Sequence, residues 1–167
     1  LLDAQVPSDI IDIVFRKRYY APSLNCELER LADLFDACGK NGYRSLGLSI
    51  SLGNQTDIQQ AEQIELDYKT KILTSLQALE KNQYHTTNSY DYFYSDSSSL
   101  GGVVAGIGIN YVLGGLKPLI ALAKKDHELH VSCRGTQALV RQGLDLGSAM
   151  KSVSTSIGGY GGGHKIA

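Results

Sequence analysis

Tryptophan is absent from the 167-residue chain, and methionine, cysteine and proline are scarce, with one, three and three residues respectively. The three cysteines form no CxxC pair, and neither they nor the four histidines cluster at the spacing of a zinc site. An odd number of scattered cysteines favours reduced, mostly buried thiols. We therefore expect no metal ligands among these residues and a cytoplasmic location.

Long hydrophobic runs are also missing. No apolar stretch approaches the roughly 20 residues that a helix needs to cross a bilayer. The N-terminal residues lack the basic flank of a signal peptide and contain Asp3, so we expect no membrane partner. Hydrophobic residues still make up 43% of the chain, which permits a packed core and argues against wholesale disorder.

The charged residues are unevenly distributed, although the formal net charge is only −1. Residues 1–100 carry nine Lys/Arg and fourteen Asp/Glu, a net charge of −5, whereas residues 101–167 carry seven Lys/Arg and three Asp/Glu, a net charge of +4. A basic C-terminal part suits an anionic ligand. A solvated basic surface would have the same composition.

The first part of the chain, residues 1–55, is predicted to be mostly helical. Apolar side chains recur every three or four residues over about residues 24–38, which predicts an amphipathic helix, and Gly39 follows at the position of a C-terminal cap. Residues 9–18 are a second candidate helix. The stretch 46–52 alternates leucine or isoleucine with glycine or serine, and this period of two by itself favours a strand.

The second part, residues 56–81, is predicted to be one long connecting helix. Thr56, followed three residues later by Gln59, has the pattern of a capping box. Apolar side chains recur along one face of this helix and charged or polar side chains along the other. Such a helix can bridge two lobes.

The third part, residues 82–167, combines predicted strands and helices. Strands are expected over 90–94, 119–123 and 129–133, with a hairpin turn over 124–128 and helices over 136–142 and 145–157. Gly158 should end the last helix. The glycines within 101–115 do not match the GxGxxG spacing and follow no clear strand, so we do not expect a dinucleotide-binding loop.

Ser132 and Arg134 are the first candidate ligand-binding residues. They lie two apart on a predicted strand, so their side chains point to the same face. Arginine binds phosphate through two parallel hydrogen bonds, and serine adds a donor. The alternative is an arginine at a strand end that pairs with Asp145 or is solvated.

The glycine-rich C-terminal segment is the second candidate. Five of the six residues from Gly158 to Gly163 are glycine, and His164 and Lys165 follow. Glycines let the backbone approach a ligand closely, and successive N–H groups turned inward form an anion site. Gly161, Gly162 and Gly163 with the two cationic side chains could then contact phosphate. The alternative is a flexible glycine-rich tail.

Together these motifs resemble one family. VSCRG, GLDLGSAM and GGYGGGHKIA, in this order and spacing, resemble the DHH-associated domain of RecJ-like phosphoesterases. The SxR and GGGH motifs of that domain match at Ser132, Arg134, Gly161, Gly162, Gly163 and His164. LGGVVAGIGINYVL and KPLIALAK match its opening helix and strand. Upstream, RLADLFDACGK resembles the N-A-x-G-R motif that closes the DHH domain, so the resemblance covers about residues 27–167.

The resemblance implies an α/β fold class in three pieces. Residues 1–55 would be the mostly helical end of a DHH domain, 56–81 the connecting helix, and 82–167 the substrate-binding domain with a mixed sheet. In the family the stretch around 46–52 is helical, and we therefore expect a helix there. The cysteine before Gly39 resembles the archaeal, GINS-associated branch.

The resemblance also implies an activity. The family hydrolyses single-stranded DNA or RNA with two divalent ions, Mn²⁺ or Mg²⁺, held by an N-terminal half that this sequence lacks. We therefore expect no catalytic residue and no metal ligand here, and no activity of this segment alone. Ser132, Arg134, the glycine segment, His164 and Lys165 would bind substrate, as would Lys40, which stands at the position of the motif arginine.

Two departures from the family pattern support other hypotheses. Asp36 and Lys40 replace the asparagine and arginine of N-A-x-G-R; aspartate cannot donate as asparagine does, and lysine lacks the arginine fork. The full-length protein could therefore be a weakened or inactive RecJ relative that serves as a scaffold in a GINS–replicative helicase assembly. A third hypothesis is a phosphodiesterase of short oligonucleotides or cyclic dinucleotides, which shares the GGGH motif.

Overall fold

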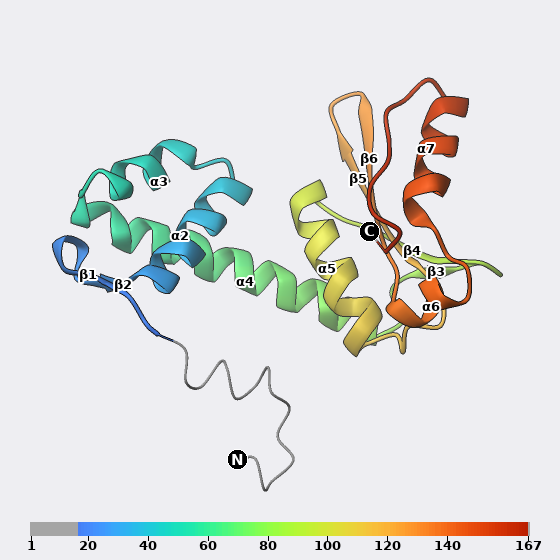
Figure 1. Ribbon diagram of the computed structural model, residues 1–167, viewed down its shortest axis with the longest axis horizontal. Coiled ribbons are helices and arrows are strands. Elements are labelled where there is room, and N and C mark those ends of the chain that lie inside the picture. Colours follow the sequence, from blue (N-terminus) through green and yellow to red (C-terminus); the bar gives the residue numbers. More distant parts are fainter. Residues whose placement is uncertain (1–16, 167) are drawn as a thin grey trace, which may run out of the picture. The chain divides into compact units, whose positions relative to one another are not determined.

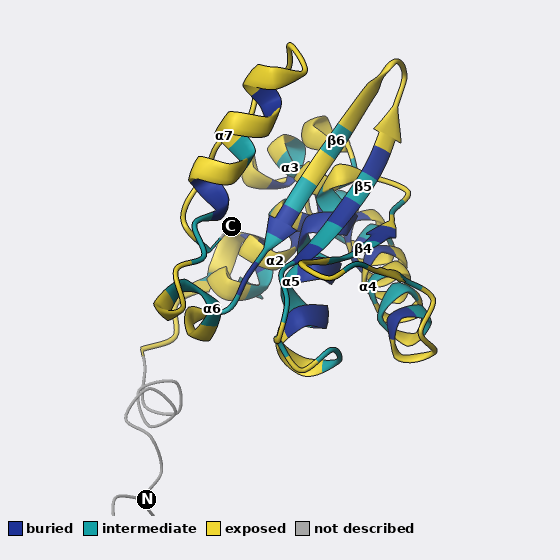
Figure 2. Cartoon of the chain, turned by 90° about the vertical axis from the view of Figure 1, so that its right-hand side faces the viewer, coloured by how far each residue is buried: buried dark blue, intermediate teal, exposed yellow. Residues whose placement is uncertain are grey.

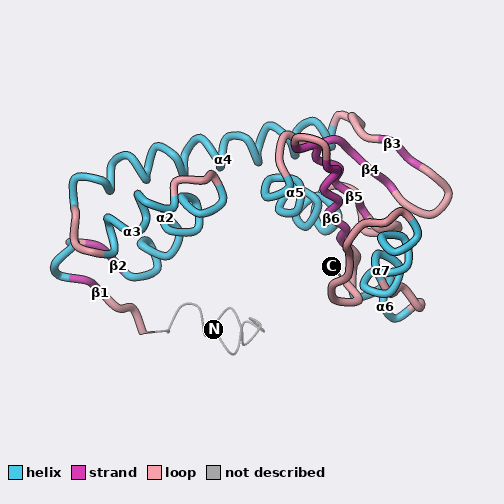
Figure 3. Tube along the Cα trace, turned by 90° about the horizontal axis from the view of Figure 1, so that it is seen from above, coloured by secondary structure: helices cyan, strands magenta, loops and turns pink. Residues whose placement is uncertain are grey.

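The computed structural model describes residues 17–166, and the predicted helix over 9–18 lies almost wholly outside them (Figure 1). The chain divides into two compact units, and the boundary between them in the sequence lies between Tyr68 and Lys69. This point lies inside one uninterrupted helix, α4 (Ile58–Glu80) (Figure 3). None of the helices within 17–166 is long and apolar enough to cross a membrane.

The first unit is mostly helical. Before α4 its elements are β1 (Tyr20–Ala21), η1 (Pro22–Leu24), β2 (Cys26–Glu27), α2 (Leu28–Lys40), α3 (Arg44–Ser51) and η2 (Gln55–Asp57). Its core consists of Leu24, Leu31, Leu34, Cys38, Ile50 and Ala61. Arg30 of α2 donates hydrogen bonds to Glu62 and Glu65 of α4, which ties these two helices together.

The helix predicted over 24–38 begins later and ends later than expected. Asn25 has a left-handed conformation with φ 49°, so the chain first makes a small hairpin of β1 and β2, and α2 starts at Leu28. Gly39 is not the cap, because it lies inside the helix. Gly42, with φ +85°, is the left-handed residue, and the N–H of Tyr43 donates to the carbonyl of Cys38 at 2.8 Å, as in a Schellman motif.

Two further predictions for the first unit concern the stretch 46–52 and the start of the connecting helix. The stretch 46–52 is helical, as the family resemblance indicated, and the strand favoured by its period of two is wrong. Ile50 is fully buried while Leu48 and Leu52 are 61% and 81% exposed, so the alternating residues do not share one buried face. The capping box at Thr56 is also wrong, because the side chain of Asn54 accepts from the Thr56 N–H and a short 3₁₀ turn precedes α4.

The second unit is a four-stranded mixed sheet with helices, which confirms the α/β fold class. Its elements after α4 are β3 (His85–Thr86), β4 (Asp91–Tyr94), α5 (Ser98–Tyr111), β5 (Leu119–Lys125), β6 (Glu128–Arg134), α6 (Gln137–Arg141) and α7 (Leu146–Ser156). The strand order is β3-β4-β5-β6. Only β4 and β5 are parallel, and α5 forms the crossover between them.

The core of the second unit lies between α5 and one face of the sheet. Buried and less buried residues alternate along β5, as the period of a strand requires (Figure 2). Leu119, Ala121 and Ala123 of β5 are buried on this face together with Phe93 of β4. A Cβ added to Gly101 of α5 would lie only 2.9 Å from the Cβ of Ala121, so the helix packs very closely on the strand.

Candidate phosphate-binding site

The C-terminal end of β6 places Ser132 and Arg134 on the face of the sheet that α5 covers. A Cβ built on Gly102 would lie 3.3 Å from Nη2 of Arg134 and 3.5 Å from Oγ of Ser132. A Cβ on Gly106, one helical turn later, would lie 3.7 Å from Nε of Arg134. Both candidate side chains are half-buried. The glycines of α5 therefore leave room for the guanidinium between helix and strand.

The guanidinium of Arg134 has one internal hydrogen bond, from Nη1 to the carbonyl of Cys133 at 2.8 Å. Within residues 17–166 no carboxylate forms an ion pair with it. Asp145, its alternative partner, instead caps α7 by accepting from the N–H of Ser148 at 2.9 Å. Arg134 therefore retains donors for an external anion, for which its fork geometry is suited.

The glycine-rich segment doubles back along α7 (Figure 1). Gly158 ends the helix with φ +72°, as predicted. A Cβ on Gly161 would lie 2.8 Å from the carbonyl oxygen of Met150, and one on Gly147 would lie 2.4 Å from that of Gly163. Because these contacts are with backbone atoms, only glycine allows this packing.

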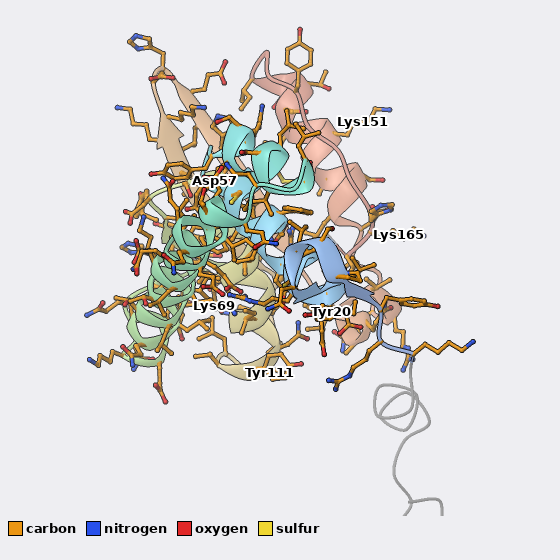
Figure 4. All side chains as sticks on the ribbon, turned by 90° about the vertical axis from the view of Figure 1, so that its left-hand side faces the viewer. Tyr20, Asp57, Lys69, Tyr111, Lys151 and Lys165 are labelled. Atoms are coloured by element: carbon orange, nitrogen blue, oxygen red, sulfur yellow. The ribbon has the colours of Figure 1, made fainter. Side chains whose placement is uncertain are left out.

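Two main-chain hydrogen bonds anchor the end of the segment. The carbonyl of Lys165 accepts from the N–H of Leu146 at 2.9 Å, and the carbonyl of Ile166 accepts from the N–H of Gly135 at 2.8 Å. Lys165 thus lies beside the start of α7 (Figure 4), and Gly135 directly follows Arg134. The structure brings the segment to the end of the strand that carries Arg134.

The side chains near this junction remain separate. His164 and Lys165 are exposed, as are Gly161, Gly162 and Gly163. Among the described residues, no hydrogen bond or ion pair joins His164 or Lys165 to Arg134.

Lys40 lies in the first unit, at the end of α2. Its Nζ is 2.6 Å from Oδ2 of Asp36 and 5.9 Å from the ring centroid of Tyr68. The hydrogen bond with Asp36 raises the pKa of Lys40, and burial raises the pKa of the Tyr68 hydroxyl. The ammonium group is therefore fully charged at neutral pH and already bound to a carboxylate.

Gly102 and Gly106, which form one wall of the site, were not predicted from the sequence. Their spacing of four was a usable signal, because residues four apart share one face once residues 98–111 are recognised as a helix. The glycines of this stretch serve close packing of α5 on the sheet. Within 17–166, no three His, Cys, Asp or Glu side chains are grouped so that they could hold a metal ion.

A comparison with known families finds a match for the C-terminal part of the chain. Residues 102–167 match the family model of the DHHA1 domain, and this range contains Ser132, Arg134 and the whole glycine-rich segment.

A particular relative is an uncharacterized protein of the archaeon Methanocaldococcus jannaschii. The two sequences are 28% identical over 137 residues, which cover 82% of this chain and 29% of that protein. The chain thus spans less than a third of the length of this relative.

Proposed function

We propose that this chain is the substrate-binding part of a metal-dependent, RecJ-like exonuclease or phosphodiesterase that hydrolyses single-stranded DNA or RNA. The observation that carries the proposal is the placement of Ser132 and Arg134 side by side against Gly102, with no carboxylate among the described residues paired to the guanidinium. The DHHA1 match over the same residues supports it.

Each group would have a distinct role in holding the strand. Arg134 would bind two oxygens of one phosphate, and the hydroxyl of Ser132 would donate to a third. The exposed glycine segment would let the backbone of a neighbouring nucleotide approach closely, and His164 and Lys165 would contact that nucleotide. Lys40 would add a phosphate contact from the DHH part.

The proposed metal ions, Mn²⁺ or Mg²⁺, have no ligand set among residues 17–166. On the family resemblance, we propose that an N-terminal half of the full-length protein holds them. Bound there, they would activate the water that attacks the phosphodiester. The residues described here would orient the strand for that attack.

The test is cleavage of a single-stranded oligonucleotide by the full-length protein with Mn²⁺. Hydrogen bonds to charged groups contribute about 1.5–3 kcal/mol, so Arg134→Ala should lower kcat/KM by roughly 10- to 100-fold. Arg134→Lys should recover only part of this loss, because lysine has the charge without the fork. His164→Ala should also lower the rate.

Lys71→Ala is the control, because it removes an exposed cation of α4 and should leave the rate unchanged. Wild-type rates in both Arg134→Ala and His164→Ala would refute the proposed role of this site. Products from long and two-nucleotide substrates separate an exonuclease from a phosphodiesterase of short oligonucleotides.

The ion pair of Lys40 with Asp36 favours a second candidate function. A cation that is bound to a carboxylate at 2.6 Å is a weaker phosphate ligand than the free arginine of the family motif. We propose as the alternative an inactive scaffold that binds GINS and the replicative helicase. Degradation of single strands by the full-length protein with Mn²⁺ would exclude this alternative, and binding to purified GINS without degradation would support it.

A further inference from the structure

The face of the sheet that points away from α5 carries a row of aromatic side chains on β3 and β4. Phe93 of β4 is buried on the α5 side, so its neighbours Tyr92 and Tyr94 point to the opposite face. His85 of β3 lies directly across from Tyr92 in the register of the sheet. The ring of Tyr90, just before β4, continues the row, with its centroid 6.2 Å from that of Tyr92. His85, Tyr90, Tyr92 and Tyr94 form the aromatic row.

The rings of the aromatic row contact one another. The imidazole of His85 stacks on the ring of Tyr92, with centroids 4.7 Å apart and an interplanar angle of 21°. The ring of Tyr94 meets both of them edge-on, with centroid distances of 5.9 Å to His85 and 6.1 Å to Tyr92. Contacts of this geometry are favourable for aromatic pairs. The row is therefore a preformed aromatic surface.

The aromatic row is open to solvent within residues 17–166. The packing of α7 on this face is at the opposite edge of the sheet, where Sγ of Cys133 in β6 lies 3.3 Å from Sδ of Met150 (Figure 2). Tyr94 is 70% exposed, Tyr90 is 40% exposed, and His85 is exposed as well. Ring surface is thus available to a ligand.

The rest of this face combines aliphatic side chains with one lysine and has no carboxylate on its strands. Beyond the aromatic row, the strand residues that alternate onto it are Ile120, Leu122, Lys124, Leu129, Val131 and Cys133. The two carboxylates of the four strands, Asp91 and Glu128, alternate onto the α5 side. Lys124 is exposed, so the strand residues of this face attract phosphate and do not repel it.

We propose that the aromatic row stacks the bases of a single-stranded nucleic acid. Rings of tyrosine and histidine stack on unpaired bases, and this stacking tolerates any sequence because every base has a π-face. The inference rests on the proposed function, which makes a single strand the ligand, and it adds a second contact surface on the face of the sheet opposite Arg134. It does not require the nucleotide at Arg134 to reach the aromatic row.

Charge favours this ligand over a second copy of the chain. An apolar face could also pair with its own copy in a dimer. The strand residues of this face carry no acid, however, and residues 101–167, which contain β5 and β6, have a net charge of +4. Two such surfaces would repel each other, whereas a polyanion is attracted to them.

The test measures binding of the 167-residue chain to two labelled probes by fluorescence anisotropy. One probe is a deoxythymidine hexamer, and the other is an abasic hexamer with the same number of phosphates. Tyr94→Ala and His85→Ala should each weaken binding of the thymidine hexamer roughly 5- to 150-fold, the range for the loss of one stacked base, and leave binding of the abasic hexamer unchanged. Tyr94→Phe should bind like wild type, because stacking requires the ring and not the hydroxyl.

Tyr111→Ala is the matched control, because Tyr111 is an exposed tyrosine at the end of α5, outside the aromatic row. Wild-type affinity of both Tyr94→Ala and His85→Ala for the thymidine hexamer, or an equal loss for both probes, would overturn the inference. It would also be overturned if sedimentation showed a wild-type dimer that Tyr94→Ala dissociates while binding of the hexamer stays unchanged.

Arg134→Ala separates this inference from the proposed function. It should weaken both probes, because both contain phosphates. If it weakens neither while Tyr94→Ala and His85→Ala act selectively, the proposed phosphate site fails and the aromatic row stands. If only Arg134→Ala weakens binding, the phosphate site stands and the inference about the aromatic row fails. If wild type binds neither probe, both fail.

Discussion

Asp145 determines where α7 begins. Its carboxylate accepts a hydrogen bond from the backbone N–H of Ser148, and the pKa of Asp145 is lowered mainly by this bond, with a smaller contribution from the charge of Lys165. Leu146, the first residue of the helix, in turn donates to the carbonyl of Lys165. One capping residue thus supports both the helix start and the anchor of the glycine segment.

The lowered pKa of Asp145 predicts how stability depends on pH. The ionised carboxylate stabilises the fold above the ordinary pKa of 3.8, and this contribution is lost as the pH falls through the lower folded-state value. Asp145→Asn retains an acceptor for Ser148 but does not titrate. We expect a lower Tm than wild type at pH 7 and a smaller difference at acidic pH.

Thermal unfolding of both proteins across this pH range measures the effect. Asp145→Ala, which has no acceptor, should lower the Tm at every pH. A Tm difference between wild type and Asp145→Asn that does not change with pH would contradict the assignment.

At the scale of elements, the glycines of α5 determine how closely this helix approaches the sheet. Gly101 faces β5, Gly102 and Gly106 face the side chains of β6, and Gly108 faces Leu79 of α4. Glycine lowers the stability of a helix interior. Replacing one of these glycines with alanine therefore stabilises the helix only where the added methyl group has room. The spacing between helix and sheet is therefore specified by residues without side chains.

Two equivalent substitutions in α5 should have opposite effects on stability. In Gly101→Ala the new Cβ meets the Cβ atoms of Ala121 and Ser95 at 2.9 and 3.1 Å, and we expect a loss of about 1–3 kcal/mol. In Gly106→Ala the nearest atom is Nε of Arg134 at 3.7 Å, an ordinary contact. Because alanine has a better helix propensity than glycine, Gly106→Ala should stabilise the chain by about 0.5–1 kcal/mol.

Urea unfolding of the two variants and wild type measures these free energies. Each variant serves as the control for the other, because both add one methyl group to the same helix. Changes of the same sign would contradict the packing described for α5.

The elements that the sequence predicted correctly are those with a strong local pattern. The strands over 119–123 and 129–133 and the helices over 136–142 and 145–157 are present with ends shifted by a few residues. β3 was not predicted, because a strand of two residues is too short to show an alternating pattern. The stretch 46–52 misled the pattern analysis because glycine and serine between apolar residues mimic a strand, although packing selects a helix.

In the candidate site, too, only the features with a local sequence pattern were predicted. Alternation along a strand was enough to place Ser132 and Arg134 on one face, and both contact the Gly102 position. The return of the glycine segment to Gly135 depends on contacts between elements distant in sequence. No local pattern contains that information.

At the scale of the whole molecule, the separation of charge is the dominant electrostatic feature. The +4 net charge lies within residues 101–167, which carry the candidate site, and the −5 net charge lies within residues 1–100. A single strand that binds the basic part releases counterions, so its affinity should fall as salt rises.

The salt dependence of binding should report the phosphate contact of Arg134. A plot of log K against log salt for a thymidine hexamer should be linear, and Arg134→Ala should reduce the magnitude of its slope by about 0.7, the value for one phosphate contact on a single strand. Lys71→Ala should leave the slope unchanged. An unchanged slope in Arg134→Ala would show that its guanidinium does not neutralise a phosphate.

Each of the two units contains one buried thiol. Cys38 is in the first unit and Cys133 in the second, and burial raises the pKa of both. Because alkylating reagents attack the thiolate, these two sulfurs should be protected until their own unit opens. The order in which mass spectrometry detects alkylation of Cys38 and Cys133 therefore reports which of the two units unfolds locally first.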